Sequence, residues 1–161
     1  MSSSENRPTL LAALLDSWDR NNTILINLLC ALPEGALELR PTETSPTIGG
    51  LFAHIHYCRL VFVAEDAPEH AKPVPEGHEW RHVYDREQIV RWLKESAQVL
   101  RAAVQDRLQT GKDMNLHYAH PVLMLQHMIW HEGYHHGQIK LALKLAGQPF
   151  AIALAQRDAR D

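Results

Sequence analysis

The chain has 161 residues, a length that fits one domain with a core large enough to fold without disulfides. Its formal net charge is only −3 and its lysine and arginine residues are scattered, which argues against nucleic acid as a partner. Two cysteines make no disulfide framework, no basic leader precedes an apolar segment, and no window reaches the roughly 18 apolar residues of a membrane span. We therefore expect a soluble, cytoplasmic protein with no membrane partner and one domain over residues 1–161.

Four segments carry the 3.6-residue apolar period of amphipathic helices, and no segment alternates as a strand would. The first helix is expected at about 8–31, with the Pro-Glu-Gly stretch at 33–35 ending it. The second is expected to open with Ser45 as its N-cap and Pro46 at its first position, and to stop before Pro68.

The region 66–82 holds three prolines and a glycine, which predict a surface loop of the kind that often borders a site. Trp80 lies in this loop and is expected to be exposed, where it would help to form the lid of a pocket. The other three tryptophans fall at helical spacing and are expected in the core: Trp18, Trp92 and Trp130.

The third helix is expected to begin near Asp85, which has the spacing of a capping box with Gln88, and to end at the Thr-Gly-Lys-Asp stretch. The fourth is expected over 121–147, about 26 residues or roughly 39 Å. Four helices without strands predict an all-α four-helix bundle, a fold whose interior commonly houses metal sites. The ends, 1–7 and 150–161, are expected to be tails, with disorder and a short final helix both open.

Histidine is the unusual residue of this composition. There are 11 histidines, and a cluster of them falls within residues 117–136. His131 and His135 are four apart, so on a helix they stand one above the other and can share one metal ion. A catalytic zinc site needs a third protein ligand and a position open to water.

The segment 131–135 reads HEGYH and matches the HExxH pattern of zinc proteases. Those enzymes take their third ligand from downstream, but Gln138 and Leu141 occupy the corresponding positions, and Glu132 is the last glutamate of the chain. A peptidase also commonly aligns its substrate on a strand edge, and no strand is expected here. We therefore disfavour a zinc peptidase.

The third ligand must then come from upstream, and His54 is the best candidate because it interrupts an otherwise apolar helix. His56 faces nearly the opposite way. Cys58 lies one turn from His54 and is open as a fourth ligand, a thiol near the site or an inert core residue, of which we favour the last. The remaining nearby histidines are expected to be ordinary hydrogen-bonded side chains: His117, His120 and His127.

Two stretches carry a family resemblance: ALELRPTETSPTIGGLFAHI, which leads into the second helix, and HEGYHHGQIKLALKLAG in the fourth. With them the chain resembles the DinB-like superfamily of four-helix metalloproteins, which also includes thiol-dependent S-transferases and mycothiol-dependent maleylpyruvate isomerases. Carried over position by position, the resemblance implies His54, His131 and His135 as the metal ligands. Gly137 and Gln138 match the glycine and glutamine of the family's ending.

Four further side chains are candidates for roles around the ion. Glu132 follows a ligand directly and is a candidate general base, with a solvent-facing glutamate as the alternative. Gln138 and Asn22 can hold a ligand or a substrate by hydrogen bonds, although ordinary packing explains both equally well. His136 stands where the family commonly has arginine, so we expect it beside the site or at a helix contact.

Two functions follow from such a site. A three-histidine ion, zinc or nickel, can activate water or bind a thiolate, which predicts a hydrolase or a low-molecular-weight-thiol S-transferase acting on a small molecule. The alternative is a non-catalytic, stress-associated bundle in which the ion fastens the second helix to the fourth. Four protein ligands would favour the second function. The resemblance also implies a homodimer.

Overall fold

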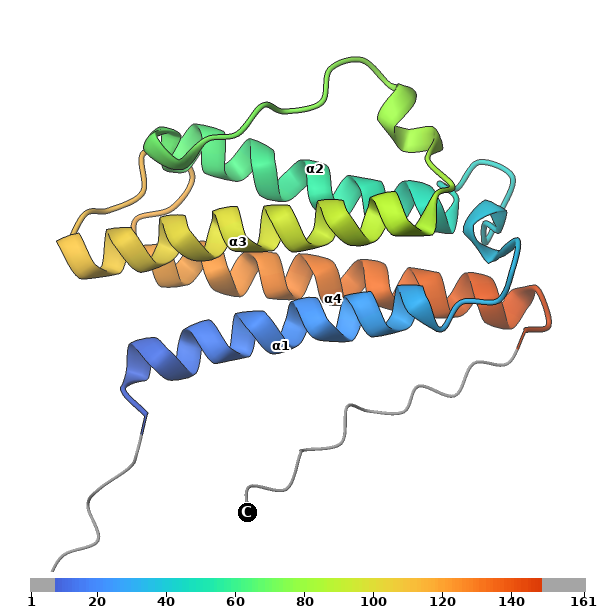
Figure 1. Ribbon diagram of the computed structural model, residues 1–161, viewed down its shortest axis with the longest axis horizontal. Helices are drawn as coiled ribbons and strands as arrows, with labels where there is room; N and C mark the ends of the chain where they lie inside the picture. The colour runs from blue at the N-terminus through green and yellow to red at the C-terminus, as the bar shows by residue number, and fades with distance from the viewer. Residues whose placement is uncertain (1–7, 149–161) are drawn as a thin grey trace, which may run out of the picture.

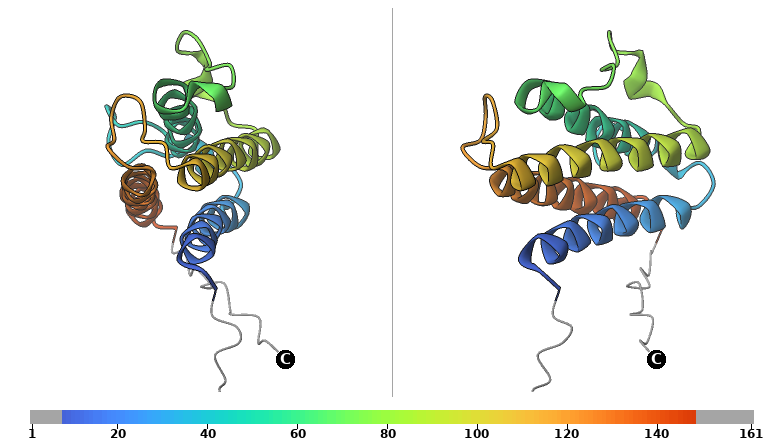
Figure 2. Two further views of the ribbon diagram at one scale, coloured as in Figure 1. Left: turned by 90° about the vertical axis from the view of Figure 1, so that its left-hand side faces the viewer. Right: turned by 60° about the vertical axis from the view of Figure 1, so that its left-hand side comes forward.

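The computed structural model describes residues 8–148, which form four long helices that run side by side (Figures 1 and 2). Their bounds are Leu10–Cys30 for α1, Ile48–Asp66 for α2, Arg86–Thr110 for α3 and Pro121–Leu145 for α4. Short 3₁₀ helices occupy the connections at Ala36–Glu38, Pro68–His70 and Glu79–His82. Over these residues the predicted all-α four-helix bundle is confirmed, and the two predicted tails lie outside them. None of the helices at 8–148 has the length and apolar character needed to cross a membrane.

Polar side chains cap the helix starts. Asp85 accepts a hydrogen bond from the Gln88 amide at 3.1 Å, as the sequence predicted. The prediction for α2 is wrong by two residues: Thr47 is its N-cap, and its hydroxyl accepts from a first-turn amide at 3.0 Å. Ser45 lies in the preceding turn, where its hydroxyl is 2.7 Å from that of Thr42.

The core consists of two apolar clusters, one around Phe52 and one around Trp18, and each draws residues from all four helices. In each helix, polar residues lie between the residues of one apolar cluster and those of the other. Together these polar residues form a layer across the middle of the bundle. Trp18 is fully buried, as predicted. Trp130 was predicted in the core but is 68 % exposed, because α4 turns that face outward.

The connection between α2 and α3 arches over α2 before it reaches the short helix Glu79–His82 (Figure 1). Gly49 of α2 permits close contact with the end of this connection, since a Cβ on Gly49 would lie 2.4 Å from the carbonyl oxygen of Val83. Trp80 consequently stacks on Tyr57, with ring centroids 4.4 Å apart. The expectation of an exposed Trp80 is therefore wrong, because contact with α2 leaves it only 7 % exposed.

Two helical glycines should respond in opposite ways to alanine. Gly49→Ala is expected to lower the free energy of unfolding by about 1–3 kcal/mol, because the new methyl group must displace backbone. Gly133→Ala is expected to raise it by about 0.5–1 kcal/mol, because an added Cβ meets open space and alanine restricts the unfolded chain. Urea unfolding measures both, and a stable Gly49→Ala variant would contradict the close contact.

Candidate metal centre

Helices α2 and α4 bring three histidines together in the bundle. His54 comes from α2, and His131 and His135 come from successive turns of α4. One ring nitrogen from each lies within 4.8 Å of the other two, and the Nε2 atoms of His131 and His135 are 3.0 Å apart. Two nitrogen ligands of a tetrahedral zinc ion lie about 3.3 Å apart, so the cluster fits one ion after small adjustments.

A hydrogen bond fixes the ring of His135. Its Nδ1 lies 2.7 Å from the Oε1 of Gln138, an oxygen that only accepts, so Nδ1 carries the proton and Nε2 presents its lone pair. The amide nitrogen of Gln138 donates in turn to the hydroxyl of Tyr134 at 3.2 Å. Gln138 therefore makes the kind of contact that the sequence suggested for it.

The buried nitrogens of the cluster suit a cation. Since the Nε2 of His135 is an acceptor, its contact with the Nε2 of His131 places the proton of His131 on that atom. The Nδ1 of His131 is then an acceptor, and it is buried without a hydrogen-bond partner among residues 8–148. With the proton of His131 on Nδ1 instead, both Nε2 lone pairs would be free, and a divalent ion would replace the nitrogen–nitrogen contact with two coordination bonds.

All three imidazoles are neutral at neutral pH, the form that binds metal. Burial lowers the pKa of His54, and it lowers that of His135 as well. For His131, burial together with the nearby His135, His54, His127 and Arg59 lowers the pKa to about 4. The site is therefore set up to hold positive charge on an ion rather than on its own rings.

Acid should destabilise the metal-free protein through these rings. The pKa of His131 is about 4 in the folded protein and 6.5 for an unperturbed histidine, so unfolding takes up a proton between these two pH values. Stability is then highest above pH 6.5 and falls as the pH drops toward 4. Thermal unfolding of metal-free protein across this window measures the decline, which should be shallower in His131→Leu. Identical declines in both proteins would contradict the lowered pKa.

A cavity of about 530 Å³ opens beside the cluster, a size that suits a small molecule. From the cluster and its support, His54, His135 and Gln138 line it. The remaining walls come from the start of α2 with the residues before it and from the segment 80–82. An ion held by the three histidines would thus have a cavity at its side, as a catalytic ion requires.

Two other candidate ligands do not complete the group. The Sγ of Cys58 lies 3.4 Å from the Nε2 of His54, which makes it a thiol near the site. Burial raises the pKa of this thiol to about 11, so it is protonated in the metal-free protein. The Nδ1 of His127 is hydrogen-bonded to the hydroxyl of Tyr118. Within 8–148, the possible ligands that come together here are the three histidines.

His56, His117 and His120 have other hydrogen-bond partners. His56 is buried, with its Nδ1 2.9 Å from the carbonyl oxygen of Trp92 and its ring stacked on that residue. The Nδ1 of His117 lies 2.9 Å from a carboxylate oxygen of Asp66, and His120 caps α4. His136 is half-buried on α4 and is not among the residues that line the cavity.

Glu132 is bound within the polar layer of the bundle. It is only 1 % exposed, so the solvent-facing alternative is wrong. Its Oε1 accepts from the Nε of Arg59 at 2.6 Å and its Oε2 from Nη2 at 2.8 Å, while Asn21 also donates to Oε2. The general-base role finds no support in this geometry, because both carboxylate oxygens already accept hydrogen bonds from Arg59 and Asn21.

Arg59 lies next to the candidate site and was not predicted from the sequence. It is fully buried and also donates to the Oδ1 of Asn22 at 2.9 Å and to the carbonyl oxygen of Leu93 at 2.8 Å. Asn22, expected near the ligands, thus contacts Arg59 instead. The sequence did contain a signal for this pair, because Arg59 directly precedes the apolar run LVFV of α2. A buried guanidinium requires a carboxylate, and α4 contains a single one, Glu132.

The Arg59–Glu132 pair joins the same two helices that carry the histidines. Glu132 directly follows His131 in α4, and Arg59 directly follows Cys58 in α2. The two parallel hydrogen bonds of a guanidinium and a carboxylate restrict both the distance and the rotation of the helices they join. The pair therefore helps to hold His54 opposite the two histidines of α4.

Comparison with known proteins agrees with this architecture. The model of the DinB family matches residues 1–159, nearly the whole chain. No curated protein and no solved structure matches it. The match covers all four helices and the three clustered histidines, and the chain belongs to the DinB family.

Proposed function

We propose that this protein is a metal-dependent enzyme that acts on a small molecule, either by hydrolysis or by transfer of a low-molecular-weight thiol. The observation that carries the proposal is a group of three neutral histidines beside a cavity of about 530 Å³. Imidazole ligands suit zinc and nickel, so one of these is the proposed ion. The two cysteines are free, which fits the reducing cytoplasm as its compartment.

A divalent ion in this site would supply Lewis-acid chemistry, lowering the pKa of a bound water or thiol. Residues of the chain would position the ion's ligands and admit the substrate. Gln138 orients the ring of His135, the Arg59–Glu132 pair holds α2 against α4, and the cavity admits a substrate. The non-catalytic, stress-associated bundle is less well supported, because a structural ion normally has four protein ligands and no cavity beside it.

Metal analysis followed by an activity screen tests the proposal. Protein purified without an affinity tag is expected to contain about one zinc or nickel ion per chain. A panel of small thiols with electrophilic acceptors, and of activated esters, is then assayed before and after chelation. Turnover that chelation abolishes supports an enzyme. Bound metal without any turnover would favour the non-catalytic bundle, and a protein that takes up no metal would refute both functions.

We also propose that the protein is a homodimer, formed through the outward face of α4. Five large apolar side chains at helical spacing lie exposed along one side of this helix: Leu123, Trp130, Tyr134, Leu141 and Leu145. Four of them are placed symmetrically about position 132, so an antiparallel copy of α4 would place Leu123 opposite Leu141 and Trp130 opposite Tyr134. Burial of such a stripe supplies the driving force.

Light scattering after size-exclusion chromatography measures the expected dimer. Trp130→Glu should halve the mass, because a charge would be buried at the centre of the stripe. Lys94→Glu, an exposed change on α3, is the control and should leave the mass unchanged. A parent chain that is monomeric at micromolar concentration would contradict the proposal.

A further inference from the structure

We propose that the cavity beside the three histidines binds a small organic anion, whose carboxylate or phosphate group is held by Arg40 and Arg81. This inference rests on the proposed function for the ion, and it adds the class of substrate. The reacting part of such a molecule would lie toward His54 and His135, and its anionic group toward the two arginines. All four residues line the same cavity.

The charges around the cavity are of one sign. Arg40 and Arg81 both line it, and no aspartate or glutamate is among the described residues of its walls. With a divalent ion on three neutral imidazoles, the fixed charge would reach about +4, although the chain as a whole carries −3. An anion with one or two charges would offset part of this excess.

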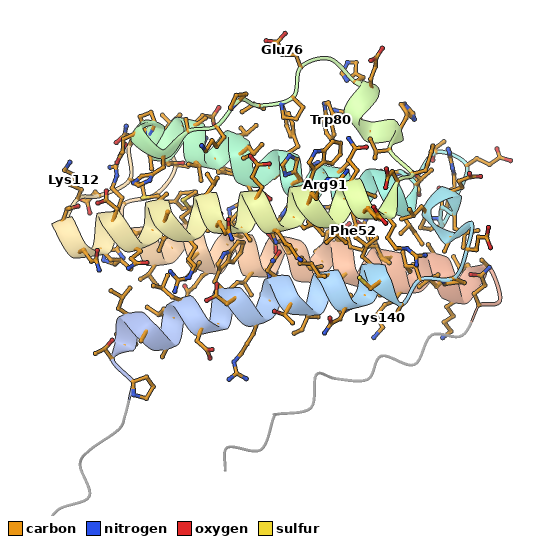
Figure 3. All side chains as sticks on the ribbon, in the orientation of Figure 1. Phe52, Glu76, Trp80, Arg91, Lys112 and Lys140 are labelled. Atoms are coloured by element: carbon orange, nitrogen blue, oxygen red, sulfur yellow. The ribbon has the colours of Figure 1, made fainter. Side chains whose placement is uncertain are left out.

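Arg81 is held in place before any ligand arrives. Its guanidinium lies over the ring of Trp80, 4.9 Å from the centroid. Trp80 is itself stacked on Tyr57, and its indole nitrogen donates to the carbonyl oxygen of Gly77 at 3.0 Å. Figure 3 shows Trp80 between the arched connection and α2. A stacked guanidinium loses little conformational entropy on binding, which favours it as an anion ligand.

The backbone beneath Arg81 is also fixed. A Cβ at Gly50 would lie 3.1 Å from the carbonyl oxygen of Arg81, so this glycine lets the segment 79–82 pack directly on the first turn of α2. This packing places Arg81 on the wall of the cavity that His54 also lines.

Within residues 8–148, no carboxylate neutralises either arginine. Arg40 donates to the backbone carbonyl of Glu43 at 3.3 Å, and no ion pair within 4.0 Å joins Arg40 or Arg81 to a carboxylate of the described residues. Arg107, in contrast, is paired through two nitrogens with Glu69. Guanidinium groups that keep their donors free bind carboxylate or phosphate in the same two-point manner.

Hydroxyl groups add donors on the same wall. The Oγ1 of Thr47 accepts from the amide of Gly50, which leaves its hydroxyl proton to donate toward the cavity that Thr47 lines. Thr44 also lines this wall. A carboxylate or phosphate has more acceptor positions than two arginines fill, so these donors would complete its hydrogen bonding.

Calorimetric titration of the metal-loaded full chain tests the inference with three probes: succinate, neutral succinamide and inorganic phosphate. Succinate or phosphate should bind at least tenfold more tightly than succinamide. The better of the two anions identifies the group that the natural ligand carries. Arg40→Gln and Arg81→Gln should each weaken anion binding about tenfold, as expected for a charge-assisted hydrogen bond. Arg91→Gln, an exposed change on α3, is the matched control and should bind as the parent does.

Metal content is measured on every sample, because it separates a failure of the anion-binding inference from a failure of the proposed metal-dependent function. A full complement of metal with anion binding that is unchanged in both arginine variants would overturn the inference, since the anion would then sit on the ion alone. Equal binding of succinate and succinamide would overturn it as well. Absence of metal from the parent protein would instead count against the proposed function.

Discussion

Replacing Glu132 with alanine is expected to lower the free energy of unfolding by about 3–5 kcal/mol, because it leaves a fully buried guanidinium without its carboxylate. The Arg59–Glu132 pair is inaccessible to solvent on both sides, so water cannot replace the missing partner. Asn22 and the carbonyl oxygen of Leu93 still accept from Arg59, but neither carries a charge. Urea unfolding, monitored by tryptophan fluorescence, measures the loss.

Two comparisons separate the buried charge from the loss of a side chain. The double variant Arg59→Met with Glu132→Leu removes both charges and should recover most of the stability, since apolar residues often replace a buried pair without cost. Asp19→Ala removes the partner of Arg101 in an exposed pair and should cost less than about 1 kcal/mol. If Glu132→Ala costs no more than Asp19→Ala, the buried pair is not what holds α2 against α4.

The fold could be predicted from the sequence because its signals are local. Apolar spacing gave four helices, and Asp85 and Pro121 marked the starts of α3 and α4 within a residue. Ser45 and Thr47 are both favoured N-cap residues, and residue type alone slightly prefers serine, so local preference did not identify Thr47. A tertiary contact decides it: the amide of Ile48 donates to the carbonyl oxygen of Leu39 at 2.8 Å, which holds the chain outside the helix up to Thr47.

Only part of the candidate site could be predicted from the sequence. His131 and His135 are linked by helical spacing, and His54 stood out as a polar residue in an apolar helix, so the sequence predicted the three residues that the structure brings together. The partner of Glu132 could not, because periodicity predicts which face a residue occupies but not which residue faces it across the bundle. The exposure of Trp130 was not predicted for a related reason. An amphipathic pattern does not show whether a large apolar residue is covered by its own chain or by another chain.

Replacing a clustered histidine is expected to have the largest effect on metal binding. His54→Ala and His131→Ala should each reduce the metal content of the purified protein to background, because each variant leaves two imidazoles where a zinc site has at least three protein ligands. His56→Ala should retain about one ion per chain, since its ring is stacked on Trp92 and its Nδ1 lies against a backbone carbonyl. Elemental analysis of protein purified without a tag measures the content.

A graded variant tests whether the ring orientation matters as well as the ligand itself. Gln138→Ala removes the acceptor for the Nδ1 proton of His135 but leaves all three ligands in place, so metal should still bind, about 10–100-fold more weakly. Circular dichroism on each variant establishes that the helices remain. Folded His54→Ala, His131→Ala and His56→Ala proteins with the same metal content would mean that no ion is shared between α2 and α4. The cavity beside the histidines would then have no ion at its side to act on a substrate.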